Sequence, residues 1–261
     1  MNPIAGILET GTQTASRDVI RTATAAQTPR QNRLLAALPL KSYQRLLPHL
    51  NPVVLPAEST LHDAGAPETQ VYFPTAGVIA NLCTLETGAS AQFALIGREG
   101  LIGVASIFGA GLSRTRAVVT SPGHAYWISG DVLKSQFERD LELRRLLLRY
   151  TLALIAQIGQ TAVCYRHHSL EQRMCRWLLS CLDRLPSNEL RMAQHEVATV
   201  LGVRRVSITD TAAVLQHAGL IGCSRGSITV LDRPRLQARA CECYEVVERE
   251  YDRLLNPANG L

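Results

Sequence analysis

The chain has 261 residues, of which 46% are hydrophobic and 19% charged, with a formal net charge of +5 at pH 7. This composition excludes an intrinsically disordered chain and is sufficient for ordinary hydrophobic cores in one or two domains. The sequence contains no uninterrupted apolar run of about 18 residues, and its first 30 residues lack the apolar core of a signal peptide. We therefore expect a cytoplasmic protein with no membrane partner.

The N-terminal half predicts an arm followed by a β-rich domain. Residues 1–30 are rich in Thr, Ala and Gln without helical periodicity, which predicts a flexible arm. Leucines in residues 32–50 predict short helices that are broken at Pro39 and Pro48. Short β-rich runs then alternate with glycine and proline at residues 53–55, 71–73, 78–85, 92–96, 116–121 and 124–129. Many short strands at this spacing predict a compact sandwich or barrel.

Residues 141–164 predict one long helix, since they contain no proline and only Gly159 as a possible break. A helix of about 24 residues spans roughly 36 Å, which is too long for one small domain to cover. One side carries an apolar stripe at steps of three and four residues, as in paired helices: Leu143, Leu147, Tyr150, Leu154 and Ile158. We expect this stripe to form a homodimer interface, although burial against the chain's own β-rich domain would give the same pattern.

Residues 192–221 have the spacing of a helix-turn-helix. An apolar stripe of Val197, Ala198 and Leu201 is followed by Gly202, which suits the left-handed turn that ends a helix. A second stripe at residues 208, 212 and 215 marks a second helix that ends at Gly219. Arg225-Gly226 then predicts the turn of a small hairpin, or wing. The outward surface proposed to contact DNA comprises Arg204, Arg205, Val206, Ser207, Thr209, Asp210 and, in the wing, Arg225.

These motifs resemble the Crp/Fnr transcription regulators over about residues 32–232, most strongly at residues 169–185, 202–221 and the wing. The resemblance implies an α+β fold in which a cyclic-nucleotide-binding-like, jelly-roll-like β-roll is joined by a long dimerisation helix to a C-terminal winged helix-turn-helix. The domains expected after the arm are residues 31–130, 131–165, 166–232 and 233–261. The resemblance implies a homodimeric transcription regulator and not an enzyme. This regulator would bind an inverted-repeat operator in double-stranded DNA. If it activates transcription, it would also bind RNA polymerase.

The resemblance also assigns roles at the DNA surface. Arg205 matches a family arginine that contacts bases, and guanine O6 and N7 are its expected partners. Val206 and Asp210 replace a glutamate and an arginine of the best-known members, so we expect a different operator. Arg204 stands where a capping serine is common, and we interpret it as a phosphate contact kept at the expense of the cap.

The effector of the β-roll is less well specified. In the family's cyclic-nucleotide pocket, the resemblance implies that Glu99 contacts the ribose hydroxyl and that Arg114 or Arg116 contacts the cyclic phosphate. Ile158 stands where cyclic-AMP binders have a polar residue that contacts adenine. The long glycine-rich segment between Glu99 and the arginines, and the apolar Ile158, both fit cyclic AMP poorly. Glu99 could instead pair with Arg98 or Arg116. No cysteine precedes Cys83, so the family's N-terminal iron–sulfur cluster is not expected, and we expect no cofactor.

Two C-terminal features remain. Cys241-x-Cys243 could bind a metal with Cys223 or His217, but two cysteines on adjacent helical turns point in different directions, so we expect no metal. Residues 234–255 predict one amphipathic helix whose acidic face would repel DNA. We expect this helix to pack on the winged helix or on a partner subunit.

Two other classes stay open. A regulatory module that acts through protein contacts would keep the β-roll and the long helix, but the exposed Arg204-Arg205 pair argues against it. A cupin-like enzyme would need clustered metal ligands, and His49, His62 and His124 show no such spacing.

Overall fold

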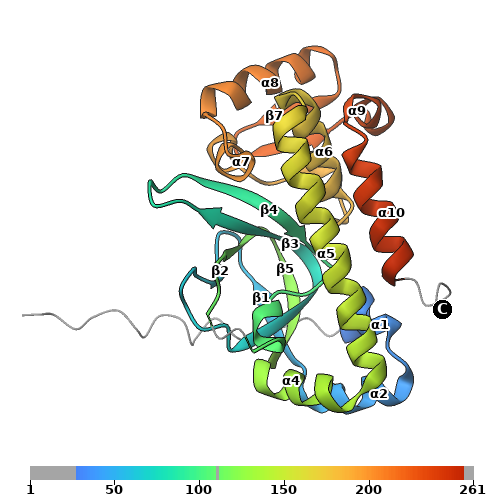
Figure 1. Cartoon of the computed structure of the whole chain (residues 1–261). Coiled ribbons are helices and arrows are strands. Elements are labelled where there is room, and N and C mark those ends of the chain that lie inside the picture. Colours follow the sequence, from blue (N-terminus) through green and yellow to red (C-terminus); the bar gives the residue numbers. More distant parts are fainter. Residues whose placement is uncertain (1–27, 110–111, 256–261) are drawn as a thin grey trace, which may run out of the picture.

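The computed structural model describes residues 28–109 and 112–255 (Figure 1). Residues 1–27 of the expected arm lie outside the described residues, and the described chain begins with the short turn η1 (Pro29–Gln31). The helices α1 (Arg33–Ala37) and α2 (Leu40–Leu46) and the turn η2 (Leu47–His49) follow, with the predicted breaks at Pro39 and Pro48. Asn32 caps α1, because its side chain accepts hydrogen bonds from two amides of the first turn.

A curled antiparallel sheet forms the β-roll. Its strands are β1 (Asn51–Leu55), β2 (Thr60–His62), β3 (Gln70–Thr84), β4 (Ser90–Ile96) and β5 (Arg116–Ser129), in the order β1-β5-β3-β4 with β2 also on β5. The runs predicted at residues 71–73 and 78–85 are one strand, β3, because register shifts let it bend and continue. Gly77 permits this bend: its φ is +92°, and an added Cβ would lie 2.8 Å from the carbonyl oxygen of Ser121.

The short helix α3 (Val104–Ile107) lies between β4 and β5. Two helices, α4 (Gly130–Arg139) and α5 (Leu141–His167), follow β5 and lead out of the β-roll. The helix α5 runs past the sheet to the C-terminal domain (Figure 1). It is the one helix in the described part of the chain that is long and apolar enough to cross a membrane, a test that core helices also pass. One face of α5 is buried here against the rest of the chain.

The stripe predicted as a dimer interface is covered by its own chain. Leu143, Leu147, Tyr150 and Leu154 are buried in a core that also holds residues of the β-roll and of the C-terminal helix, and Ile158 is half-buried against it. The hydroxyl of Tyr150 donates to the carbonyl oxygen of Leu101 at 2.8 Å. The apolar residues of α5 that are exposed lie on another side: Leu148, Leu152, Ile155 and Val163, with Leu141 at the first turn.

The C-terminal domain begins with α6 (Leu170–Leu182) and contains β6 (Glu189–Leu190), α7 (Gln194–Leu201), α8 (Arg205–His217), β7 (Ile221–Ser224) and β8 (Ser227–Val230). Its small sheet has the order β6-β8-β7. The core of this domain includes Val78 and Leu95 of the β-roll, so the two domains are packed together. At the same contact, a Cβ on Gly202 would lie 2.9 Å from the Cβ of Ala91.

The predicted C-terminal helix is two helices, α9 (Arg233–Arg239) and α10 (Cys243–Leu255), because Ala240 adopts an extended conformation. The helix α10 lies along α5 (Figure 1) and contributes to both large cores. Tyr244 belongs to the core of the winged helix, whereas Val247, Tyr251 and Leu254 belong to the core beneath α5. The expected packing on the winged helix is therefore only part of its contact.

Candidate nucleic-acid interface

The helix pair turns as the sequence predicts. Gly202 ends α7 with φ +64° and ψ +40°, a left-handed conformation that favours glycine. The amide of Val203 donates to the carbonyl oxygen of Ala198 across this turn. Ile208, Ala212 and Leu215 bury one face of α8 in the domain core. The opposite face of α8 is consequently free to contact a partner.

The predicted DNA-contacting residues lie on that free face or beside it. Arg204, Arg205, Val206, Thr209 and Asp210 are exposed, and Ser207 is half-buried. Val206 is 68% exposed, so its methyl groups are accessible to a partner. Arg204 is the N-cap of α8 and provides no side-chain cap, because a guanidinium has no acceptor atom.

A cleft of about 250 Å³ separates the start of α8 from the wing. Arg205 lines it from α8, and Ser224 and Arg225 line it from the wing. Gly226 shapes the wing turn with φ +80°, and the hydroxyls of Ser224 and Ser227 are 2.6 Å apart across it. Two arginines from separate elements thus face one cleft, an arrangement that favours an anionic ligand.

Gln194 is a further residue of this surface, one that was not predicted from the sequence. It lies at the start of α7 and lines the same cleft, and its Oε1 accepts a hydrogen bond from Thr209 Oγ1 at 2.8 Å. The bond holds Thr209 toward α7. Arg205 and Asp210 are five positions apart on α8, so their side chains leave the helix on different sides.

The four residues expected for an effector pocket are not brought together. Glu99 is buried and pairs with Arg184, at the end of α6, instead of Arg98 or Arg116. Arg114 and Arg116 are exposed, and Arg116 pairs with Asp63 at 3.1 Å. Ile158 packs against the core beneath α5.

The Glu99–Arg184 pair joins the β-roll to the C-terminal domain. Glu99 Oε1 accepts from both Nε and Nη2 of Arg184 at 2.8 Å and from the amide of Gly97 at 3.0 Å. Burial alone would lower the pKa of Arg184, but the neighbouring carboxylates of Glu99 and Glu248 raise it above its ordinary value. An added Cβ on Gly97 would lie 2.7 Å from the Arg184 side chain, so this glycine makes room for the pair.

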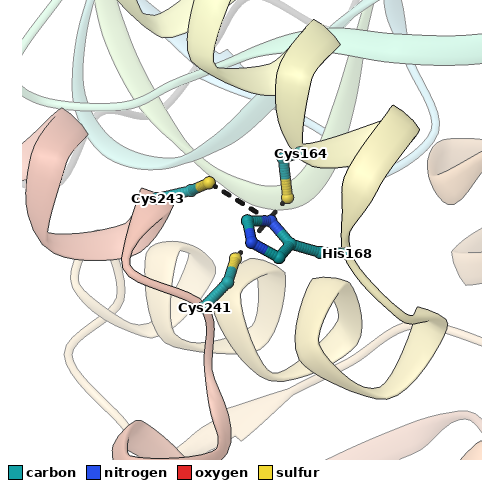
Figure 2. A group of neighbouring side chains, drawn as sticks. All are labelled: Cys164, His168, Cys241 and Cys243. Atoms are coloured by element: carbon teal, nitrogen blue, oxygen red, sulfur yellow. Dashed lines mark hydrogen bonds between the residues drawn. The ribbon is translucent and has the colours of Figure 1, made fainter.

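Four residues that can ligate a metal meet near the end of α5: Cys164, His168, Cys241 and Cys243 (Figure 2). Cys223 and His217, the partners that the sequence suggested for Cys241 and Cys243, are outside this group of described residues. Cys164 and His168 were not predicted as partners of the cysteine pair, because they precede it by more than 70 positions.

Comparisons with known proteins agree with this geometry. Residues 172–239 match the Crp-like helix-turn-helix domain. The CRP-like cAMP-activated global transcriptional regulator of Mycobacterium tuberculosis is 24% identical over 202 residues, which are 75% of this chain and 90% of that protein. FixK2 from Bradyrhizobium japonicum has a TM-score of 0.64 at 16% identity, covering 74% of this chain and 98% of its own. A CRP/FNR-family regulator from Thermus thermophilus, TTHA1359, has a TM-score of 0.60 at 20% identity, and the match covers 73% of this chain and 98% of that protein.

Proposed function

Because the chain belongs to the Crp/Fnr family of transcription regulators, we propose that it binds an inverted-repeat operator as a homodimer, with α8 of each subunit in the major groove. The observation that carries this proposal is the cleft between α8 and the wing, which two arginines line. This surface suits a regulator that contacts DNA directly. A module that acts only through protein contacts would not require a cleft lined by two arginines.

In this proposal the exposed face of α8 reads the bases. Arg205 contacts O6 and N7 of a guanine, Val206 contacts a thymine methyl, and Asp210 accepts from N4 of a cytosine. Arg204 and Arg225 contact phosphates on either side of the cleft, and Ser207 adds a hydroxyl at the first turn of α8. The bond from Thr209 to Gln194 keeps α7 and α8 in a fixed relation while they dock.

The proposed dimer forms through the exposed apolar side of α5. Leu148, Leu152 and Ile155 are 45%, 56% and 58% exposed and recur at steps of four and three residues. Gly159 continues this face with open space around its Cβ position, which allows a second helix to approach closely. A two-fold axis along α5 would set two α8 helices on half-sites about 34 Å apart. If the protein activates transcription, RNA polymerase is a further partner.

We propose that this chain is not controlled by cyclic AMP, unlike the relative whose name describes it as cAMP-activated. Glu99 is the residue that the family pocket would use for a ribose hydroxyl, and here its carboxylate is occupied by Arg184 and the amide of Gly97. We therefore propose that Glu99 anchors α6 and that the β-roll binds no cyclic nucleotide at this position. The proposed regulator works in the cytoplasm.

Arg205→Ala tests the DNA-binding proposal. Operators are first selected from a random DNA library, and gel shifts then compare selected and random DNA over a series of salt concentrations. Loss of the guanine contact is expected to cost about 1–3 kcal/mol per half-site on selected DNA and little on random DNA. The matched control is Arg249→Ala, which removes an exposed arginine from α10. Equal losses on both DNAs, or no sequence-dependent binding by the unmodified protein, would contradict the proposal.

Arg204→Ser separates helix stability from DNA affinity. The serine hydroxyl can accept a hydrogen bond from an amide in the first turn of α8, so the free energy of unfolding should rise by about 0.5–1 kcal/mol. Affinity should fall by the same factor for selected and random DNA. The slope of the logarithm of the binding constant against the logarithm of the salt concentration should become less steep by about one unit per half-site. Urea unfolding and salt-dependent gel shifts measure the two effects. A lower free energy of unfolding in the variant would show that Arg204 does not destabilise the start of α8, contrary to this prediction.

A further inference from the structure

The cysteine–histidine group lies where the two domains and the C-terminal helix meet. Cys164 is in the last turn of α5, His168 caps that helix, and Cys241 and Cys243 lie at the link between α9 and α10. Figure 2 shows the three sulfurs and the imidazole converging from these elements. The three cysteines are buried, and their sulfurs and the nearer imidazole nitrogen all lie within 4.8 Å of one another. The four groups thus surround one point.

We propose that Cys164, His168, Cys241 and Cys243 bind one Zn²⁺ ion in a tetrahedral site. Bonds of about 2.3 Å to sulfur and about 2.0 Å to nitrogen place two sulfurs about 3.8 Å apart and a sulfur and a nitrogen about 3.5 Å apart. The sulfurs of Cys164 and Cys241 are 3.6 Å apart, and Cys243 Sγ lies 3.5 Å from His168 Nδ1. The ligands are therefore spaced for a single ion.

The donor set selects the metal. Three thiolates and one imidazole suit Zn²⁺, whereas Mg²⁺ and Ca²⁺ require oxygen ligands. Four protein ligands leave no open position, so the site is structural and not catalytic. The positive charge of Arg176 lies close to Cys164 and offsets the net negative charge of an ion with three thiolates.

Neighbouring groups hold the ligands as a metal site requires. His168 presents Nδ1 to the sulfurs, and its other nitrogen, Nε2, lies 3.3 Å from Oε2 of Glu242. A carboxylate on the far side of a ligating imidazole fixes its orientation and increases its basicity. On the sulfur side, Gln160 Nε2 donates to Cys243 Sγ at 3.0 Å. Simple packing of small cysteines in a core would require neither partner.

The break between α9 and α10 gives the site its geometry. In a continuous helix, residues two positions apart point to different sides. Ala240 is extended and α10 begins at Cys243, so Cys241 lies outside either helix and can face the same point as Cys243. A bound ion would fix the start of α10 to the connection between α5 and α6. A disulfide between Cys164 and Cys241 would involve neither His168 nor Glu242.

Metal analysis of the full chain, purified without chelators, tests this site directly. We expect one zinc per chain, and Co²⁺ in its place should give thiolate charge-transfer absorption with the visible bands of tetrahedral cobalt. Cys241→Ser and Cys243→Ser should each lose the zinc and these bands. The matched control is Cys83→Ser, which replaces an exposed thiol on β3 and should keep one zinc per chain. Full zinc content in both variants would overturn the proposal.

A surface variant keeps the test valid if the cysteine variants do not fold. The carboxylate of Glu242 is 70% exposed, so Glu242→Ala should retain the far-UV circular dichroism of the unmodified chain. Its zinc affinity in competition with a chelator should fall by about 10-fold. Unchanged affinity would overturn the imidazole orientation proposed here. Unmodified protein that holds neither zinc nor cobalt, shows iron–sulfur absorption, or has lost two hydrogens to a Cys164–Cys241 disulfide would overturn the zinc site.

Discussion

Arg184→Met is expected to lower the free energy of unfolding by about 3–5 kcal/mol, because it leaves the buried carboxylate of Glu99 without its cation. The side chains of Glu99 and Arg184 are only 8% and 4% exposed, so water cannot replace the lost partner. The guanidinium also donates to the carbonyl oxygen of Ser180 at 2.6 Å. Because the pair joins the β-roll to α6, both domains should lose stability together.

The double variant Glu99→Gln, Arg184→Met is the control for this prediction. It removes both charges but leaves a side-chain amide oxygen at position 99 that can still accept from the backbone amide of Gly97, so most of the lost stability should return. Urea unfolding followed by far-UV circular dichroism measures all three chains. The claim that this charge pair stabilises the fold would be contradicted by either of two results. One is a single variant whose free energy of unfolding lies within about 1 kcal/mol of that of the unmodified chain. The other is a double variant that is no more stable than the single variant.

Ile155→Glu is expected to convert the proposed dimer to a monomer and to lower operator affinity by about 10²–10⁴-fold. The glutamates of two subunits would face each other on the exposed side of α5, where they repel and must lose their hydration. Each α8 would then bind a half-site alone, without the gain that simultaneous binding of two linked sites provides. Sedimentation equilibrium and gel shifts on selected DNA measure the two effects.

The matched control for this variant is Leu85→Glu, which adds the same charge at a leucine that is 67% exposed in the turn after β3. It should remain dimeric and bind the operator normally. Because Ile155 is 58% exposed, its replacement should leave far-UV circular dichroism unchanged. An Ile155→Glu protein that stays dimeric would place the dimer interface elsewhere on the molecule.

The helix-turn-helix was predictable from the sequence because its determinants are local. Gly202 specifies the turn, and the spacing of Ile208, Ala212 and Leu215 determines which face of α8 is buried. Once that face is known, the exposure of Val206 and Asp210 on the opposite side of α8 follows directly. The wing was also predictable, since Arg225-Gly226 is a turn signal between two short strands.

The faces of α5 could not be assigned from the sequence in this way. The helix carries apolar residues on more than one side, and periodicity alone does not tell which side its own chain covers. Leu143 and Leu147 are covered by a core to which α10 contributes, more than 90 positions later in the chain. The choice between Leu147 and Leu148 as an exposed residue therefore depends on contacts distant in sequence.

The ion pair and the cysteine group show the same limit. Glu99 and Arg184 are 85 positions apart, and Cys164 and Cys241 are 77 apart, so no short motif joins them. Cys241-x-Cys243 was a partial signal, but its interpretation assumed a continuous helix. The extended conformation of Ala240 overturns that assumption, and neither proline nor glycine marks the break in the sequence.

The shared position of α10 has a consequence for how the protein is synthesised. Domains generally fold as units while the chain emerges from the ribosome, the N-terminal one first. Here Tyr244 completes one core and Tyr251 and Leu254 another, so neither core is whole until α10 has emerged. The β-roll and the winged helix therefore each lack part of their core until the same late segment of the chain has been synthesised.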